Sequence, residues 1–273
     1  MLRPSSVEAI DYLIVGHIAL DITPQGLRLG GTAAYSALTA QALGQRVGLV
    51  TSWGADDQIG LLLERGLQIL GIPAERTTIF ENIATPRGRI QRIESIAQPL
   101  TLDAIPAEWR NAPLVHLAPI AQEIEPAIAS EFPDSMVLAT VQGWLRQWDA
   151  AGHISPAGWR DNFPALGKKG VIVMSEEDVQ HDEAVIAAMA VEAHHLVVTC
   201  GASGARVFIA GEHYQIAAPS IVEVDATGAG DIFSAAYAIQ YQRTQDPLEA
   251  AVFANRLAAD SVTRCGLASI PIE

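Results

Sequence analysis

The feature that most restricts the fold is the regular alternation of short apolar runs with longer segments of helical character. Short apolar runs separated by helical segments favour buried parallel strands, because helices then cover both faces of the sheet. The predicted strands are Tyr12–Gly16, Val47–Ser52, Leu114–Leu117, Met136–Thr140, Val171–Met174 and Leu196–Cys200. The predicted helices are Thr32–Leu43, Asp57–Leu70, Gln122–Ser130, Asp182–Ala193, Ala229–Gln240 and Pro247–Thr263. This order predicts an α/β protein with a mostly parallel central sheet.

Two segments depart from the alternation and indicate β-hairpins. In the first, Thr77–Phe80 and Gly88–Ile93 flank a turn that contains Pro86. In the second, Ala205–Ala210 and His213–Ala217 flank a Gly-Glu turn. With no internal repeat and no evident linker, we expect residues 1–273 to form a single domain.

Composition narrows the classes of partner. The chain has 273 residues, a formal net charge of −14 and 49% hydrophobic residues, which is the profile of a folded globular protein. Such an acidic protein repels a phosphate backbone, so no nucleic-acid partner is expected. Cys200 and Cys265 have no metal-site spacing. Since no signal-peptide core or membrane-spanning window is recognised, we expect a cytoplasmic protein with no membrane partner.

The most specific motif is the run Asp225-Ala226-Thr227-Gly228-Ala229-Gly230-Asp231, which leads directly into an apolar helix. Small residues at 228–230 leave backbone N–H groups uncovered at a helix N-terminus, which favours anion binding. An acidic residue beside bound phosphate makes sense as a base for an attacking hydroxyl, and Asp231 is the candidate. The alternative is a tight turn with an aspartate cap.

This run resembles the C-terminal signature of the ribokinase-like (PfkB) carbohydrate kinases, and departs from it at Ala226, where threonine is common. The resemblance implies a three-layer α/β/α sandwich with a small β lid. It also implies an enzyme that transfers the γ-phosphoryl group of ATP to an alcohol. In that family the amides of Gly228, Ala229 and Gly230 would hold the phosphoryl group, and Asp231 would deprotonate the acceptor.

Further segments extend the resemblance over the chain. Asp21, after the first strand, matches an aspartate that binds sugar hydroxyls, and Gly30-Gly31 matches a glycine pair before a helix. Tyr35 stands where the family commonly has asparagine; it is either an acceptor contact or a core aromatic. Arg146 is a further acceptor-side candidate. The lid segments, near 17–30 and 76–93, are short for the family.

The same resemblance implies a donor side and its ions. The predicted ATP-binding residues are Thr199, Gly201, Gly204, Thr227, Asn255 and Gly266. Ser175-Glu176-Glu177-Asp178 replaces the usual Asn-x-x-Glu, which leaves Asp178 as an indirect support for Mg²⁺. Some relatives also bind a monovalent cation near the residue that corresponds to Asp225.

The acceptor is left open as a sugar, a polyol or an inositol. The segment from Gln142 to Arg146 and the helix start near Tyr35 are similar to the inositol-kinase-like branch. One alternative is a nucleoside kinase, with Tyr35 and Trp144 as base-binding aromatics. Another is a catalytically silent relative that binds a ligand as a regulator. We expect a monomer or a homodimer.

Overall fold

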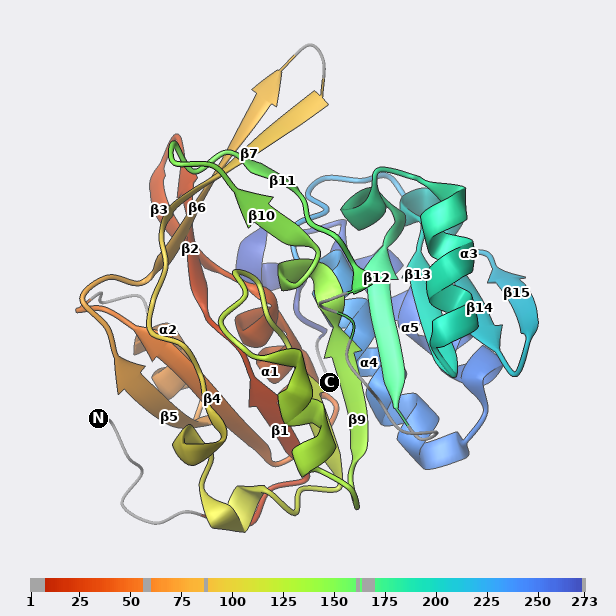
Figure 1. Ribbon diagram of the computed structural model, residues 1–273, viewed down its shortest axis with the longest axis horizontal. Coiled ribbons are helices and arrows are strands. Elements are labelled where there is room, and N and C mark those ends of the chain that lie inside the picture. The colour runs from red at the N-terminus through yellow and green to blue at the C-terminus, as the bar shows by residue number, and fades with distance from the viewer. Residues whose placement is uncertain (1–7, 56–59, 86–87, 161–162, 164–169, 272–273) are drawn as a thin grey trace.

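A nine-stranded sheet crosses the middle of the protein in the order β15-β14-β13-β12-β9-β8-β1-β4-β5 (Figure 1). The computed structural model describes residues 8–55, 60–85, 88–160, 163 and 170–271. The strands are β1 (Tyr12–Val15), β4 (Val47–Trp53), β5 (Gln68–Pro73), β8 (Leu114–Leu117), β9 (Met136–Thr140), β12 (Val171–Ser175), β13 (His195–Thr199), β14 (Ala205–Ile209) and β15 (Glu212–Ile216). The seven strands β13, β12, β9, β8, β1, β4 and β5 are parallel, and β14 and β15 add an antiparallel hairpin at the β13 edge.

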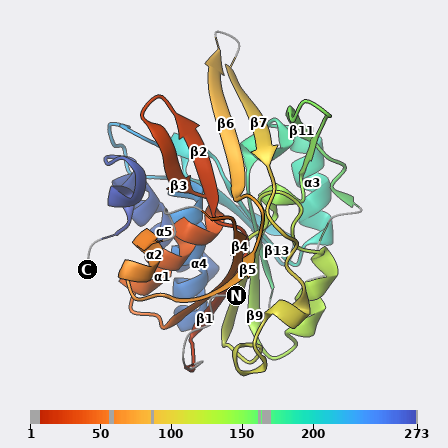
Figure 2. The same ribbon diagram turned by 90° about the vertical axis from the view of Figure 1, so that its left-hand side faces the viewer.

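The two faces of the sheet carry separate apolar cores, because successive side chains of a strand point to opposite faces. On β1, Tyr12 and Ile14 belong to one core, while Leu13 and Val15 belong to the other. The first core lies under the helices on one side of Figure 2, and the second lies under α3 and short 3₁₀ turns on the opposite side. The helices are α1 (Thr32–Ala42), α4 (Ala229–Thr244) and α5 (Pro247–Ser261) on the first face, and α3 (Glu183–Glu192) on the second.

A four-stranded sheet of order β3-β2-β6-β7 projects from the carboxyl edge of the central sheet. Its strands are β2 (Ala19–Thr23), β3 (Gly26–Gly30), β6 (Thr78–Thr85) and β7 (Gly88–Ser95), and the pair β10 (Arg146–Trp148) and β11 (Ile154–Pro156) lies next to it. In the register of this lid, Asp21 is opposite Arg28 on β3 and beside Phe80 on β6. These side chains therefore share one face of the lid.

The structure confirms the α/β architecture and the strand pairing of the two predicted hairpins. The turn residues 86–87 of the first hairpin lie outside the described residues. The structure also corrects two predicted helices. Only α2 (Gly60–Glu64) forms among the described residues of the predicted Asp57–Leu70 helix, and Gln68–Pro73 is instead the edge strand β5. Gly66, with φ 78°, ends the helix by entering the left-handed region. The predicted Gln122–Ser130 helix is reduced to a 3₁₀ turn at Pro126–Glu131.

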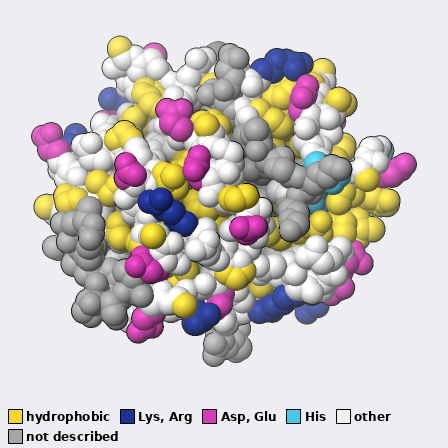
Figure 3. Space-filling view, turned by 60° about the horizontal axis from the view of Figure 1, so that its bottom comes forward, with side chains coloured by type: hydrophobic (Ala, Val, Ile, Leu, Met, Phe, Trp, Pro, Cys, Tyr) yellow, Lys and Arg dark blue, Asp and Glu magenta, His cyan; other side chains and the backbone are white. Residues whose placement is uncertain are grey.

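The surface agrees with the acidic composition. On the face in Figure 3, the described acidic side chains are scattered among apolar and neutral ones. The few described Lys and Arg side chains on this face form no continuous basic patch. Within the part of the chain that the structure describes, no helix has both the length and the apolar character needed to cross a membrane.

Candidate active site

The predicted site residues converge at the carboxyl ends of the parallel strands, below the lid. Ligands of open α/β sheets bind at this edge, where the strand order changes direction. Here β4 follows β1 on one side and β8 returns to its other side, so the change lies between β1 and β8. The start of α4 and the lid strand β2 face this position.

The segment from Asp225 to Asp231 forms a turn that opens directly into α4. Gly228 has φ 81°, and a Cβ atom there would lie 2.4 Å from the Tyr35 ring, so both conformation and packing require glycine. The Ala229 N–H donates to the Ala226 carbonyl at 3.2 Å, which differs from its expected role as a free amide. The next N–H groups, of Gly230 and Asp231, belong to the first turn of α4, where helix geometry supplies no carbonyl partner. Space around Gly230 is open, since a Cβ there would meet no atom within 4 Å.

Asp231 lies in this first turn and is half-buried. Burial raises the pKa of its carboxyl to about 6, and the nearby Asp178 and Asp21 carboxylates act in the same direction. A hydrogen bond from the Thr32 hydroxyl and the charge of Arg146 oppose the rise. The result is a carboxylate that can take up a proton close to neutral pH.

Asp21 projects from β2 toward the same space. Its carboxylate lies against the backbone of Gly30, where a Cβ atom would be 2.4 Å from Oδ2. Asn82 on β6 donates its amide to Asp21 Oδ1 at 3.4 Å. Gly31, with φ 89°, turns the chain from β3 into α1. The glycine pair therefore allows the close approach of Asp21 to the start of α1.

Arg146 and Asp178 form the opposite wall. The Arg146 guanidinium lies over the Phe80 ring at 5.7 Å and donates to the Ile120 carbonyl at 3.4 Å. Its charge lowers the pKa values of both Asp231 and Asp178. Burial raises the pKa of Asp178 overall. Its carboxylate accepts hydrogen bonds from the Ser175 backbone N–H at 2.8 Å and from the Gln142 amide at 3.3 Å. The positive charge of Arg146 thus opposes the rise in pKa of two carboxylates, Asp178 and Asp231.

Tyr35 and Trp144 are both buried, which changes their expected roles. The Tyr35 side chain is 0% exposed beneath Gly228, and its hydroxyl has no hydrogen-bond partner among the described residues. Burial raises the pKa of this phenol. The Trp144 ring is 1% exposed and its indole N–H donates to the Ile124 carbonyl. Both aromatic rings pack within the core in this structure, so neither offers a face to a nucleobase.

The predicted donor-side residues divide into open and packed positions. Thr199 ends β13, and Gly201 follows it with φ 51° and open space around it. Gly204 is packed so closely that a Cβ would lie 2.1 Å from the Ile216 carbonyl oxygen. The buried Asn255 amide donates to the same carbonyl at 2.9 Å, so this residue holds the end of β15. Gly266 donates its N–H toward Asp225 Oδ2 at 3.4 Å.

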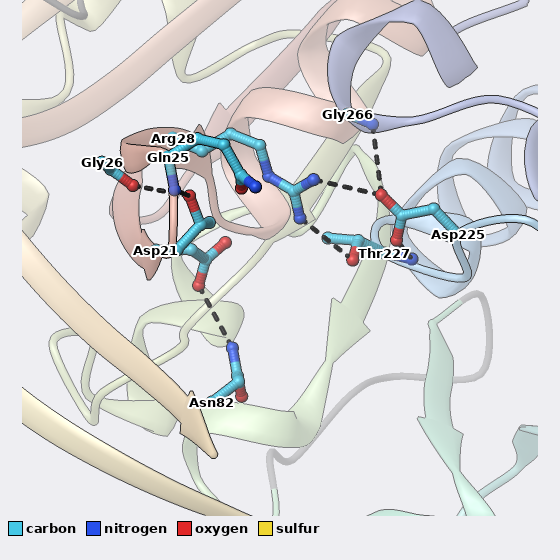
Figure 4. Close-up of polar contacts among 9 residues, drawn as sticks. Asp21, Gln25, Gly26, Arg28, Asn82, Asp225, Thr227 and Gly266 are labelled. Carbon is cyan, nitrogen blue, oxygen red and sulfur yellow. Dashed lines mark hydrogen bonds and ion pairs between the residues drawn. The ribbon is translucent and has the colours of Figure 1, made fainter. Parts of the chain in front are cut away.

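Sequence reasoning missed three residues that structure brings to the site: Thr32, Asn82 and Arg28. The Arg28 guanidinium reaches from β3 to Asp225 and to Thr227, as Figure 4 shows. The only sequence signal was the alternation that places Arg28 on the same lid face as Asp21. Its partners lie about two-thirds of the chain away in sequence, so no local pattern could identify them.

The fold and site define an α/β protein with a helix N-terminus, suited to an anion, beside a carboxylate of raised pKa. Residues 167–273 match the family described as pfkB family carbohydrate kinase. The chain is 26% identical over 263 residues to the cytidine kinase of Thermococcus kodakarensis, covering 89% of this chain and 92% of that protein. It is 27% identical over 253 residues to an Escherichia coli fructokinase, covering 81% of each.

A solved structure also matches the fold. A pyrophosphate-dependent kinase in the ribokinase family, complexed with a pyrophosphate analog and myo-inositol, superposes with a TM-score of 0.78 at 20% identity. The match covers 93% of this chain and 96% of that one. The chain therefore has the ribokinase fold, its residues 167–273 match the PfkB carbohydrate kinase family, and it is a phosphotransferase with an alcohol group as acceptor.

Proposed function

We propose that this kinase transfers the γ-phosphoryl group of ATP to an alcohol of a sugar, polyol or inositol, with Asp231 as the general base. One observation carries the proposal: the carboxylate of Asp231 lies at the N-terminus of α4, and its pKa is raised to about 6. A base with such a pKa is ionised at neutral pH and still accepts a proton readily.

The proposed reaction uses few groups. The acceptor hydroxyl would hydrogen-bond to the Asp231 carboxylate and lose its proton to it as the oxygen attacks the γ-phosphorus. The N–H groups at the start of α4 would stabilise negative charge on the transferred phosphoryl group. The bond between the γ-phosphorus and the bridging oxygen breaks, and ADP leaves with the electron pair. Positioning and electrostatic stabilisation supply most of the rate enhancement in such transfers.

The acceptor would lie between Asp21 and Arg146, which face the same space as Asp231. Asp21 can accept hydrogen bonds from two hydroxyls, while Arg146 can donate to acceptor oxygens. The Asn82 amide already donates to Asp21, and its carbonyl accepts from the Gln91 amide at 3.0 Å. This polar lining suits a polyhydroxylated molecule better than an apolar one.

Mg²⁺ fits this site in an indirect way. No group of three or more His, Cys, Asp or Glu residues among the described residues is arranged as a metal site. Magnesium in kinases is commonly held by donor phosphates, water and one or two carboxylates, and Asp231 and Asp178 lie close enough to interact electrostatically. Asp178 would support the ion through water, and the ion would neutralise phosphate charge.

Pyrophosphate is the second candidate donor. It is favoured by the likeness to the pyrophosphate-dependent kinase and by the packed state of Asn255, whose amide already holds backbone carbonyls. Both donors would bind the turn Asp225–Asp231, which we call the anion loop, and only ATP also needs a nucleoside pocket. The candidates are separated by an assay of acceptor-dependent release of ADP from ATP and of phosphate from pyrophosphate. Each donor is tested against sugars, inositols and nucleosides. A nucleoside preference would contradict the acceptor class that we propose.

We expect Asp231→Asn to lower kcat by at least about 100-fold, because an amide cannot accept the hydroxyl proton. Donor affinity should stay within about threefold, since the amides that hold phosphate are unchanged. Steady-state kinetics and direct donor titration measure the two effects, with the exposed Asp103→Asn as a matched control. Near-normal turnover of Asp231→Asn would remove Asp231 from the role of base.

A further inference from the structure

Arg28 connects the lid to the turn that precedes the anion-binding helix. Its Nη1 atom lies 3.1 Å from Asp225 Oδ2, and its Nη2 atom donates to Thr227 Oγ1 at 3.3 Å. In Figure 4 the guanidinium extends from β3, beside Asp21, across to this turn. One side chain thus joins two parts of the fold that are nearly 200 residues apart (197 between Arg28 and Asp225).

The Asp225 carboxylate is fully engaged by protein donors. The Thr227 N–H donates to Oδ1 at 2.9 Å, and Oδ2 accepts from both Arg28 and the Gly266 N–H. Burial alone would raise the pKa of Asp225, but these hydrogen bonds and the charge of Arg28 hold it below its ordinary value. The carboxylate is therefore ionised and already neutralised by a fixed positive charge.

A monovalent cation beside Asp225 does not fit this arrangement. Such an ion needs several oxygen ligands with free lone pairs, and it is repelled by a positive charge in contact with the same oxygen atom. The guanidinium of Arg28 is always charged, and its Nη1 atom contacts Oδ2 at 3.1 Å. The monovalent cation that the family resemblance allows is thus expected to be excluded here.

We infer that Arg28 is a positioning residue that replaces a monovalent cation: it holds the Asp225–Thr227 turn so that the N–H groups at the start of α4 face the phosphoryl donor. The inference rests on the proposed function for its catalytic consequence. Because Arg28 also belongs to the lid, the same contact fixes the position of β3 relative to the anion loop. Phosphoryl transfer by this enzyme then requires no added potassium or sodium.

Three variants test the inference by their response to ions. Wild type, Arg28→Ala and a control, Arg92→Ala, are assayed with the better donor in potassium chloride and in tetramethylammonium chloride of equal ionic strength. Arg92 is a suitable control because it lies on β7 and pairs with Glu81 and Glu94 rather than with the anion loop. We expect wild type and Arg92→Ala to differ less than about twofold between the salts. Arg28→Ala should lose at least about tenfold in kcat/KM for the donor and recover part of it in potassium chloride or in dilute guanidinium chloride.

A second readout does not depend on activity. The Tm of Arg28→Ala should rise in potassium chloride relative to tetramethylammonium chloride, because an ion that binds only the folded state stabilises it. The Tm of wild type should be the same in both salts. If no donor and acceptor pair gives turnover, the proposed function fails while this measurement still decides the role of Arg28.

Several outcomes overturn the inference. Potassium activation of wild type by several-fold would show that Arg28 does not take the place of the ion. Normal kinetics of Arg28→Ala, or a loss that no cation restores in rate or in Tm, would reduce Arg28 to a structural contact. If Arg28→Ala does not fold, Arg28→Lys and the wild-type salt comparison still decide the matter.

Discussion

The chemistry of the site depends most on the balance of charges around Asp231. The carboxylates of Asp178 and Asp21 raise its pKa, and Arg146 lowers it. The proposed base is therefore adjusted by residues from the lid strand β2, from β10 and from the turn after β12. A substitution at any of these positions should change the pH at which the enzyme works, even where it leaves the fold intact.

We expect kcat/KM for the acceptor to fall about tenfold for each pH unit below about 6, because the reaction needs the ionised form of Asp231 and its pKa is about 6. Asp178→Asn removes a negative charge that raises this pKa, so its profile should move to lower pH. The exposed Asp103→Asn should leave the midpoint unchanged. Rate profiles between about pH 4.5 and 8.5 measure the shift. A wild-type midpoint near the ordinary aspartate value would contradict this account of the site.

At the scale of the element, the start of α4 explains why two of its glycines have different tasks. Gly228 is required by its positive φ and by the Tyr35 ring beneath it. Gly230 has open space around it within the first turn of the helix. We therefore expect a substitution at Gly228 to affect mainly stability, and one at Gly230, two residues later, to affect mainly donor binding.

We expect Gly228→Ala to destabilise the protein by at least about 1–2 kcal/mol, because alanine is strained at φ 81° and its methyl group overlaps the Tyr35 ring. Gly230→Ala should leave stability unchanged or raise it by up to about 1 kcal/mol, because alanine favours helix. Its methyl group should nevertheless raise the KM for the donor. Urea unfolding and donor kinetics of both variants measure the contrast. Equal losses of stability in the two variants would be incompatible with it.

The elements differ in how well sequence could predict them. The central strands were predictable because both of their faces are buried, so each appears as a continuous apolar run such as Tyr12–Val15. The edge strand β5 was taken for helix because its apolar residues follow a short helical segment, and only residues 65–67, with Gly66 in the middle, separate the two elements. The hairpin of β2 and β3 has strands of five residues each and a strongly exposed tip, which leaves little periodicity to read.

The site shows the same division. The run from Asp225 to Asp231 was predictable because a helix start, small residues and an acid are local in sequence. The contact of Arg28 with Asp225 depends on how the lid lies over the sheet, and no local pattern encodes that distance. The buried positions of Tyr35 and Trp144 likewise follow from packing between elements.

At the scale of the whole molecule, the raised pKa of Asp231, the proposed base, would couple activity to stability. The folded protein holds a proton on this carboxyl up to about pH 6, whereas an unfolded aspartate releases it near 3.8. Stability should therefore fall as pH rises from about 4 to 6, and the full loss, at most about 3 kcal/mol, persists at neutral pH.

We expect Asp231→Asn to unfold at a temperature at least about 2 °C higher than wild type at neutral pH, because asparagine has no charge to bury. The difference should shrink near pH 4.5, where wild-type Asp231 is protonated in the folded state. Thermal unfolding of wild type, Asp231→Asn and Asp103→Asn at both pH values measures this effect. A lower Tm for Asp231→Asn, or a difference independent of pH, would contradict it.

The burial of Asp231 has a consequence for how this enzyme can change over generations or in the laboratory. A screen that rewards heat resistance alone would enrich substitutions that neutralise position 231, and under the proposed mechanism the survivors would be inert. Thermostable working variants must instead gain their stability far from the first turn of α4. Turnover has to be selected alongside heat resistance, because at this carboxylate the two demands oppose each other.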